Sequence, residues 1–528
     1  MISRVTARAQ NSERLAWLER QANERLRTAE GRVMALSDRS ADRDDAAGVN
    51  LLVQMLSLML AQARRTIDED LRSASSRPER VERLLGNVRG ALGMVEEMVS
   101  ASLDAVIFPP ERDMASLVQP YIRLARAVTR DARTELIFGT MEAFDYNVWP
   151  NSYLEIEKNV EELAPDLAAT VADLPRVAQI EYPAQADADT FLHTLVAHEV
   201  AHLALERPSV DPNYKTEWHA VFERRRQESA FAARPEDDDD VKRLSNWFRE
   251  FTCDSLGLRL VGPSFLMALT EYLLPARDPN YGPGTFRQAH PPPAWRLHRL
   301  RDQALAYFDT PLRVPGHRVL RLAREQLDRY HALLPVDEYG APPFDTRQEQ
   351  VEPFLPAQPP AQEFIESAQR EREFLAAALQ DVVGNLDDWV EKARYTRGTF
   401  QRDLPLIWDK LDQGIAPAER VVHRRGRAWS PGETKWPRAA GEFELPAPAS
   451  DWSEPVDWRS ILNGGYFYYL HHSSRTATAR TPEEERRGER DFSNSIIRGS
   501  IELSELHRQM LELRTQFDWL NDPQEPAT

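Results

Sequence analysis

Cysteine is nearly absent from this sequence, which has one, Cys253, among 528 residues. A single thiol excludes any disulfide within the chain, so we expect a reducing compartment. Positive charge is also in deficit, because 66 Lys and Arg residues stand against 84 Asp and Glu residues, a net charge of −18. This balance argues against broad binding to nucleic acid or anionic membranes and favours a cytoplasmic protein.

The sequence also lacks a secretory signal core and a clear membrane span. Its first residues, MISRVTARAQNSERLAW, contain no apolar run. The most apolar stretch, Ala46–Ala63, is uncharged but is interrupted by Asn50, Gln54, Ser57 and Gln62. We interpret it as a buried helix and predict no membrane association. Phosphate loops, dinucleotide fingerprints and nucleophile elbows are missing as well.

Two short β-type runs bounded by turn residues stand near the middle of the chain. TELIFGTM and RVAQIEYP predict strands over 134–141 and 176–183. The segment DADTFLHTLVAHEVAHLAL follows the second strand and predicts a helix that Asp187 or Asp189 opens.

The end of that segment, TLVAHEVAHLAL, places two histidines four residues apart, with a glutamate directly after the first. On an α-helix, His198 and His202 project from the same face, about one turn apart. This is the H-E-x-x-H pattern, in which two imidazoles and one carboxylate bind Zn²⁺ and leave a fourth position for water. We therefore predict a zinc site, with Glu199 at its edge as the general base.

The flanks of the histidine helix favour a metal over a chance match. They are apolar and predict burial. A buried histidine pair with a buried glutamate is costly unless a charge compensates it, and a metal ion is the simplest compensation.

The third ligand has to come from elsewhere in the chain. Glu250 and Asp254, in WFREFTCD, stand four residues apart on a predicted helix, and Trp247 and Phe251 beside them argue against a solvated pair. We predict that Glu250 binds the metal and that Asp254 accepts a hydrogen bond from a ligating histidine. Glu223 is the alternative ligand, at a spacing close to the roughly 20 residues of other zinc sites.

Three motifs in order, HEVAH, EFTCD and HPPPAWR, resemble those of the gluzincin zinc peptidases of the HtpX-like and prenyl-protein-endopeptidase group. Those proteins carry H-E-x-x-H, then E-x-x-x-D, then an H-P motif with an arginine six positions later. The resemblance covers residues 175–310, about a quarter of the chain. That group is mostly embedded in membranes, so only its catalytic core is carried over, without membrane substrates.

The resemblance implies roles for residues outside the first motif. His290 would stabilise the oxyanion of a tetrahedral intermediate, and Arg296 would be a salt-bridge partner in the site wall. From the residues alone, His290 is equally a loop histidine, and Tyr281 is a weaker oxyanion candidate. The strand 176–183 would be an edge strand that pairs with extended substrate, although a plain core strand fits the sequence as well.

We predict a mainly α (α+β) fold, a zincin-like catalytic core with a small sheet, flanked by helical N- and C-terminal regions. The expected parts are a helical bundle region over 1–135, the metallopeptidase core over 136–310, a helical extension over 311–410, and a C-terminal region with a Pro-rich linker and a terminal helix over 411–528.

The predicted function is that of a cytoplasmic zinc metallopeptidase that acts on a protein or peptide. Two alternatives stay open. One is a metal-binding scaffold or regulatory protein without catalysis, and the intact Glu199 argues against it. The other is a latent peptidase triggered by a regulatory protein partner, with the acidic run 236–240 as a lid or as a solvated loop.

Overall fold

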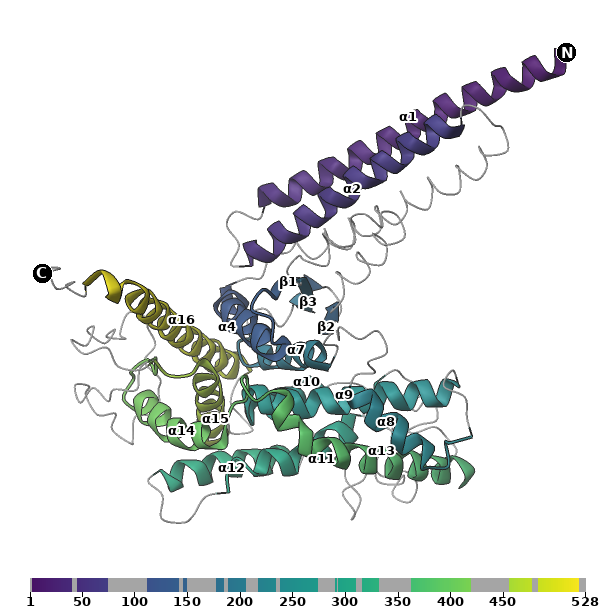
Figure 1. The fold of residues 1–528 in the computed structure, drawn as a ribbon. Coiled ribbons are helices and arrows are strands. Elements are labelled where there is room, and N and C mark those ends of the chain that lie inside the picture. The colour runs from purple at the N-terminus through teal and green to yellow at the C-terminus, as the bar shows by residue number, and fades with distance from the viewer. Residues whose placement is uncertain are drawn as a thin grey trace, which may run out of the picture. The chain divides into compact units, whose positions relative to one another are not determined.

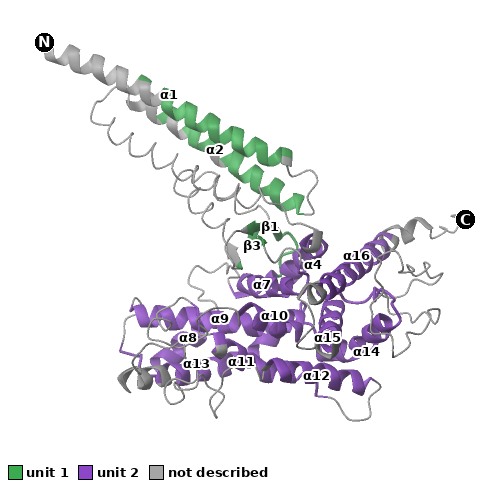
Figure 2. Cartoon of the chain, turned by 180° about the vertical axis from the view of Figure 1, so that it is seen from behind, with its two compact units in different colours: residues 1–111, 130–185 green, residues 112–129, 186–528 purple. Residues whose placement is uncertain are grey.

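The structure, a computed structural model, describes residues 2–39, 45–74, 112–141, 146–149, 177–184, 189–205, 217–233, 238–273, 290–291, 293–309, 316–331, 362–418, 455–476 and 483–521. These residues are mainly helical with one small sheet, which confirms the coarse fold class (Figure 1). The chain divides into two compact units, coloured in Figure 2: residues 1–111 with 130–185, and residues 112–129 with 186–528. The domain boundaries near 135, 310 and 410 stay predictions.

The first unit contains two long helices that pack against each other, and three strands. Its elements are α1 (Ile2–Arg39), α2 (Ala46–Ala74), β1 (Glu135–Met141), β2 (Asn147–Trp149) and β3 (Val177–Pro183). The two predicted strands are confirmed as β1 and β3.

Strand β3 lies in the middle of the sheet, not at its edge. It pairs in parallel with β1 from Val177 to Pro183 and antiparallel with β2 from Gln179 to Glu181. Of the two alternatives left open for this segment, the structure supports the core strand, because a strand with partners on both sides has no free edge to offer a peptide over the stretch that β2 covers. Strand β2 is three residues long, too short to produce a recognisable pattern in the sequence.

Helix α2 contains the apolar stretch noted in the sequence. Among the described residues, the segment Ala46–Arg65 is the one long and apolar enough to cross a membrane, and 41% of it is buried. Val49, Leu52 and Leu56 are among its buried side chains. A core helix of a packed bundle has the same length and composition, so the expected absence of membrane association stays a prediction.

The second unit contains the H-E-x-x-H segment and twelve described helical elements. They are α4 (Arg112–Thr129), the 3₁₀ turn η2 (Leu192–Leu195), α7 (Val196–Leu205), α8 (Glu217–Gln227), α9 (Asp239–Val261), α10 (Ser264–Leu273), α11 (Pro293–Leu305), α12 (His317–His331), α13 (Gln362–Trp389), α14 (Arg397–Asp412), α15 (Trp458–Thr476) and α16 (Glu483–Asn521).

Helix α7, which carries the H-E-x-x-H residues, is completely buried. All ten of its residues are buried, and it packs against α4 and α9 (Figure 1). The turn before it is capped by Asp189, whose carboxylate accepts hydrogen bonds from the backbone N–H groups of Phe191 and Leu192 at 3.1 and 3.4 Å. Tyr121 of α4 also donates to the carbonyl of His193 at 2.7 Å. The cap satisfies donors that have no partner within the turn, and it fixes where the helix begins.

Helix α9 begins in the acidic run. Asp238 accepts hydrogen bonds from the N–H groups of Asp240 and Val241, and Asp239 and Asp240 form the first turn. Negative charge at this end is stabilised by the helix dipole. These three residues therefore start a helix and do not form a lid, whereas residues 236 and 237 lie outside the described chain.

Helix α13, in the predicted helical extension, is joined to α8 and α9 by arginine–carboxylate pairs, of which three include hydrogen bonds. Arg243 donates twice to Glu371, at 2.9 Å each. The other two pairs are Arg225 with Asp381 and Arg259 with Asp387. Paired contacts of this kind fix orientation as well as position, so the extension is held along the length of α9.

Helix α15, which is rich in aromatic residues, packs against the junction of α9 and α10. The side chain of Asn463 donates to the carbonyl of Val261 at 2.5 Å and accepts from the N–H of Ser264 at 2.8 Å. One buried amide thus supplies a hydrogen-bond partner for a backbone carbonyl at the end of α9 and for a backbone N–H at the start of α10.

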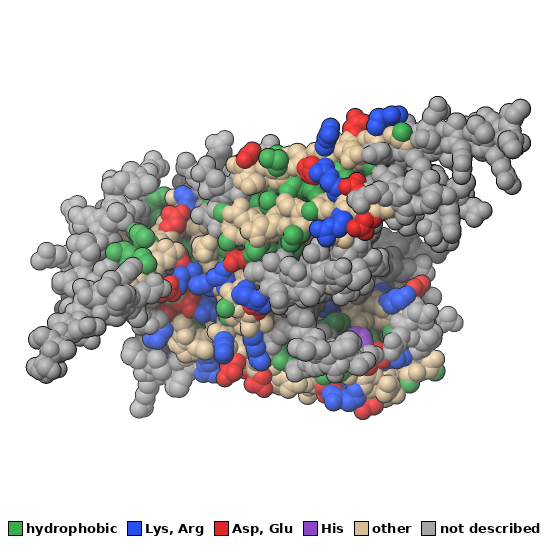
Figure 3. All heavy atoms as spheres, turned by 45° about the horizontal axis from the view of Figure 1, so that its top comes forward, with side chains coloured by type: hydrophobic (Ala, Val, Ile, Leu, Met, Phe, Trp, Pro, Cys, Tyr) green, Lys and Arg blue, Asp and Glu red, His purple; other side chains and the backbone are tan. Residues whose placement is uncertain are grey.

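The described surface is electrostatically mixed on the face that Figure 3 presents. Lys and Arg side chains alternate there with Asp and Glu side chains, without a continuous basic stripe among the residues drawn in colour. A nucleic-acid footprint is typically a clustered basic patch. The predicted lack of nucleic-acid binding agrees with this face and stays a prediction.

The junction between α9 and α10 depends on Gly262, whose backbone has φ 91° and ψ −169°. A Cβ atom there would lie 2.7 Å from the ring of Tyr395 and 2.9 Å from the Asn463 amide. We expect Gly262→Ala to destabilise the protein by about 1–3 kcal/mol through the backbone alone, with a steric cost in addition. Gly414→Ala is the matched control, because φ is 69° and no atom lies within 4 Å. Equal melting temperatures for the two variants would contradict this account of the junction.

Candidate metal centre

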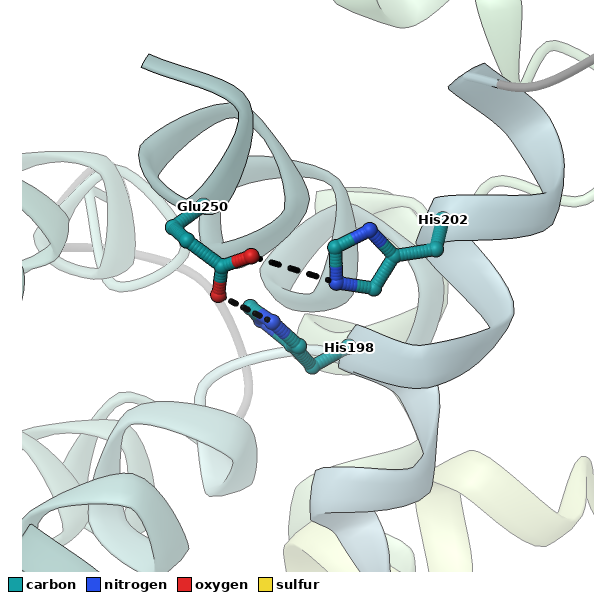
Figure 4. A group of neighbouring side chains, drawn as sticks. All are labelled: His198, His202 and Glu250. Carbon is teal, nitrogen blue, oxygen red and sulfur yellow. Dashed lines mark hydrogen bonds and ion pairs between the residues drawn. The ribbon is translucent and has the colours of Figure 1, made fainter. Parts of the chain in front are cut away.

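The H-E-x-x-H residues lie on the buried helix α7. His198, Glu199 and His202 are 6%, 5% and 6% exposed. The two imidazoles project from the same side of the helix toward α9, as Figure 4 shows. Their predicted common face is therefore present.

The carboxylate of Glu250 on α9 meets both rings. Its Oε2 lies 3.1 Å from His198 Nε2, and its Oε1 lies 3.5 Å from His202 Nε2 (Figure 4). One potential ligand atom from each residue lies within 4.8 Å of the others. Around a tetrahedral zinc ion with bonds of about 2.1 Å, neighbouring ligand atoms are roughly 3.4 Å apart. The three side chains therefore fit one ion without a change of helix position.

The other nitrogen of His198 faces away from Glu250. Nδ1 donates to Asp254 Oδ1 at 2.9 Å. Asp254 in turn accepts two hydrogen bonds from Arg296 of α11, at 2.7 and 2.8 Å, and is fully buried. This chain keeps a proton on Nδ1 of His198, so that Nε2 is the nitrogen available to a metal ion.

Cys253 is a member of the site that sequence reasoning missed. Its buried Sγ lies 3.3 Å from Nδ1 of His202. A lone cysteine carries no spacing signal, and an interior thiol is usually a small apolar side chain. The available signal was its place directly before Asp254, on the helix that carries Glu250.

His290 lies at the rim of the site. Its Nδ1 is 3.3 Å from Glu250 Oε2, and its side chain is 61% exposed. The structure thus brings His290 and Arg296 to the same cluster as the H-E-x-x-H residues. His290 contacts Glu250, whereas Arg296 contacts Asp254. Tyr281, the other oxyanion candidate, lies outside the described residues.

The alternative ligand Glu223 is engaged elsewhere. Its carboxylate accepts hydrogen bonds from Arg226, one turn along α8, at 2.7 to 3.2 Å. A buried ion pair of this kind is costly to break. The described residues contain one group of histidine, cysteine or acidic side chains close enough to share an ion, and Glu223 is not part of it.

The cluster has strongly shifted pKa values. Burial lowers the pKa of His198, but hydrogen bonds to Asp254 and Glu250 outweigh burial and raise the pKa to about 10. Burial lowers the pKa of His202 to about 3. Burial opposes ionisation of Glu250, yet hydrogen bonds from His198 and His290 hold its pKa well below the ordinary value. Without a metal, a protonated His198 therefore lies between two ionised carboxylates.

Comparisons with models of protein families, with curated proteins and with solved structures give no match to this chain. The functional interpretation therefore depends on the geometry of this cluster.

The His198 pKa predicts how stability changes with pH when metal is removed. Folding raises this pKa from 6.5 to about 10, so the stabilisation is complete below pH 6.5 and is lost as pH rises toward 10. In the presence of a chelator, we expect the melting temperature to fall from pH 7 to pH 10 more steeply for the parent protein than for His198→Gln. Parallel curves would show that His198 does not carry this proton.

Proposed function

We propose that this chain is a zinc-dependent metallopeptidase of gluzincin type, with His198, His202 and Glu250 as the metal ligands. The observation that carries the proposal is the convergence of two imidazole Nε2 atoms and one carboxylate at distances that suit a single ion. Two imidazoles and a carboxylate are the ligand set of many catalytic zinc sites. The zincin-like character of the core belongs to the same proposal.

When bound, Zn²⁺ supplies a Lewis acid that lowers the pKa of a water molecule to about 7. Glu199 follows His198 directly on α7 and is buried beside the cluster. Its proposed role is to accept a proton from the attacking water and to pass it to the leaving amine. Asp254 and Arg296 hold His198 in the tautomer that binds metal.

His290 is the proposed oxyanion-stabilising group. Nδ1 donates to the Glu250 carboxylate, so the proposed role uses the doubly protonated ring, in which Nε2–H is also a donor and is directed to a substrate oxygen. Its exposure at the rim suits a residue that meets substrate from solvent. A donor placed where negative charge develops contributes only in the transition state, which is the requirement for catalysis.

A metal-binding scaffold without catalysis is the second candidate function. A purely structural zinc ion usually has four protein ligands. Among the described residues, the cluster supplies three. This count, together with the buried glutamate at position 199, supports an enzyme over a scaffold. The protein or peptide substrate, the cytoplasmic location and a regulatory protein partner remain parts of the proposal.

The ligand set can be tested by comparing two buried glutamates. Glu250→Gln should weaken zinc binding by more than the roughly 10–100-fold that loss of an outer hydrogen-bond partner costs. Glu223→Gln is the matched control and should keep zinc, because its carboxylate pairs with Arg226. Zinc content and chelator competition give the readout. The reverse ranking of the two variants would assign the third ligand to Glu223.

The catalytic role can be tested with Glu199→Gln. The amide keeps the size of the side chain but cannot accept a proton, so we expect loss of cleavage by about 10²–10⁴-fold in rate. Zinc content should stay at the parent level. An unbiased peptide-library assay measures the cleavage, and His198→Ala should lose both zinc and activity.

The scaffold would be favoured by a different pattern. Parent and Glu199→Gln proteins would give the same cleavage profile and the same cellular phenotype, whereas His198→Ala would lose the phenotype. The metal would then be structural.

A further inference from the structure

The side chain of Cys253 lies beside Nδ1 of His202, the ring nitrogen that does not bind metal in the proposed ligand set. Its Sγ is 3.3 Å from Nδ1, and residue 253 is 0% exposed. The opposite nitrogen, Nε2, faces Glu250 at 3.5 Å. The ring is therefore held between a carboxylate on one side and a sulfur on the other, and both come from α9.

A histidine that binds metal through Nε2 must carry its proton on Nδ1. In His202, that N–H points at the sulfur of Cys253. A thiol sulfur is a weak hydrogen-bond acceptor, and 3.3 Å is a short contact for an atom of its size. The alternative direction, with S–H donating to Nδ1, would put the ring proton on Nε2 and prevent that nitrogen from binding an ion.

We propose that Cys253 is a positioning residue for His202, whose sulfur accepts the Nδ1–H hydrogen bond and thereby turns Nε2 toward the metal site. This inference rests on the proposed function, since it concerns the same ligand set. Cys253 would not touch substrate or metal.

The neighbouring residue makes the same contact with the other histidine. Asp254 accepts from Nδ1 of His198 at 2.9 Å. The five residues from Glu250 to Asp254 therefore supply one ligand and a partner for each imidazole. The two partners differ in charge, because Asp254 is an ionised carboxylate paired with Arg296, whereas Cys253 is a neutral thiol. A neutral acceptor suits position 253. A carboxylate there would add to the negative charge of Glu199 and Glu250.

The test compares Cys253→Ala and Cys253→Ser with the full-length parent. Chelator competition gives the zinc affinity, and the absorption spectrum of the Co²⁺-loaded protein reports ligand geometry. We expect Cys253→Ala to lower zinc affinity on the order of 10-fold and to shift the Co²⁺ spectrum. Cys253→Ser should be intermediate, because its oxygen accepts hydrogen bonds but has a shorter reach.

Thr252→Ala is the matched control for packing. Thr252 is equally buried on α9, but its hydroxyl donates to the carbonyl of Phe248 at 2.7 Å. This variant should lower the melting temperature of the metal-free protein and leave the Co²⁺ spectrum unchanged.

Two outcomes would overturn the inference. One is a Cys253→Ala protein that matches the parent in zinc affinity and Co²⁺ spectrum. The other is an equal loss of affinity in the alanine and serine variants, because packing and not hydrogen bonding would then explain it. If the alanine variant does not fold, Cys253→Val takes its place, because valine fills the space but offers no hydrogen-bond acceptor, and a Co²⁺ spectrum of that variant equal to the parent's would overturn the inference. A parent protein that binds no zinc would instead refute the proposed function itself.

Discussion

The buried carboxylate of Asp254, fixed between His198 and Arg296, is the interaction on which the rest of the site depends. Removing one partner from a buried charge pair costs about 3–5 kcal/mol, because the remaining charge is left uncompensated. Arg296 and His198 together hold the pKa of Asp254 below its ordinary value although burial opposes ionisation. The three side chains come from α9, α7 and α11, so one electrostatic requirement fixes three helices around the candidate metal centre.

Neighbouring helices hold the start of α7 and the end of α9 in place through hydrogen bonds. Asp189 caps the turn that leads into α7 and is paired with Arg490 of α16 at 2.8 Å. Arg490 also bonds Glu271 of α10 at 2.7 Å. At the far end of α9, Asn463 of α15 occupies the junction with α10. The C-terminal helices α15 and α16 therefore help to hold α7 and α9 in place.

The sequence was most informative where a short spacing encodes a shared helical face. His198 and His202 follow from a separation of four, and Glu250 and Asp254 from the same separation on a helix with apolar flanks. Such spacing cannot reveal contacts between helices. Cys253 was missed for that reason, because its contact is with a histidine on another helix. The position of β3 in the sheet could not be decided from the sequence, because its second partner, β2, is too short to form a pattern.

The most direct test of the metal centre is X-ray absorption spectroscopy on the full-length protein loaded with one equivalent of zinc. The proposed ligand set predicts a first shell of nitrogen and oxygen atoms only, at about 2.0–2.1 Å, with the outer scattering of two imidazoles. A sulfur atom at about 2.3 Å would make Cys253 a ligand in place of a positioning residue. Spectra without imidazole scattering, or a protein that retains no zinc, would contradict a site formed by His198, His202 and Glu250.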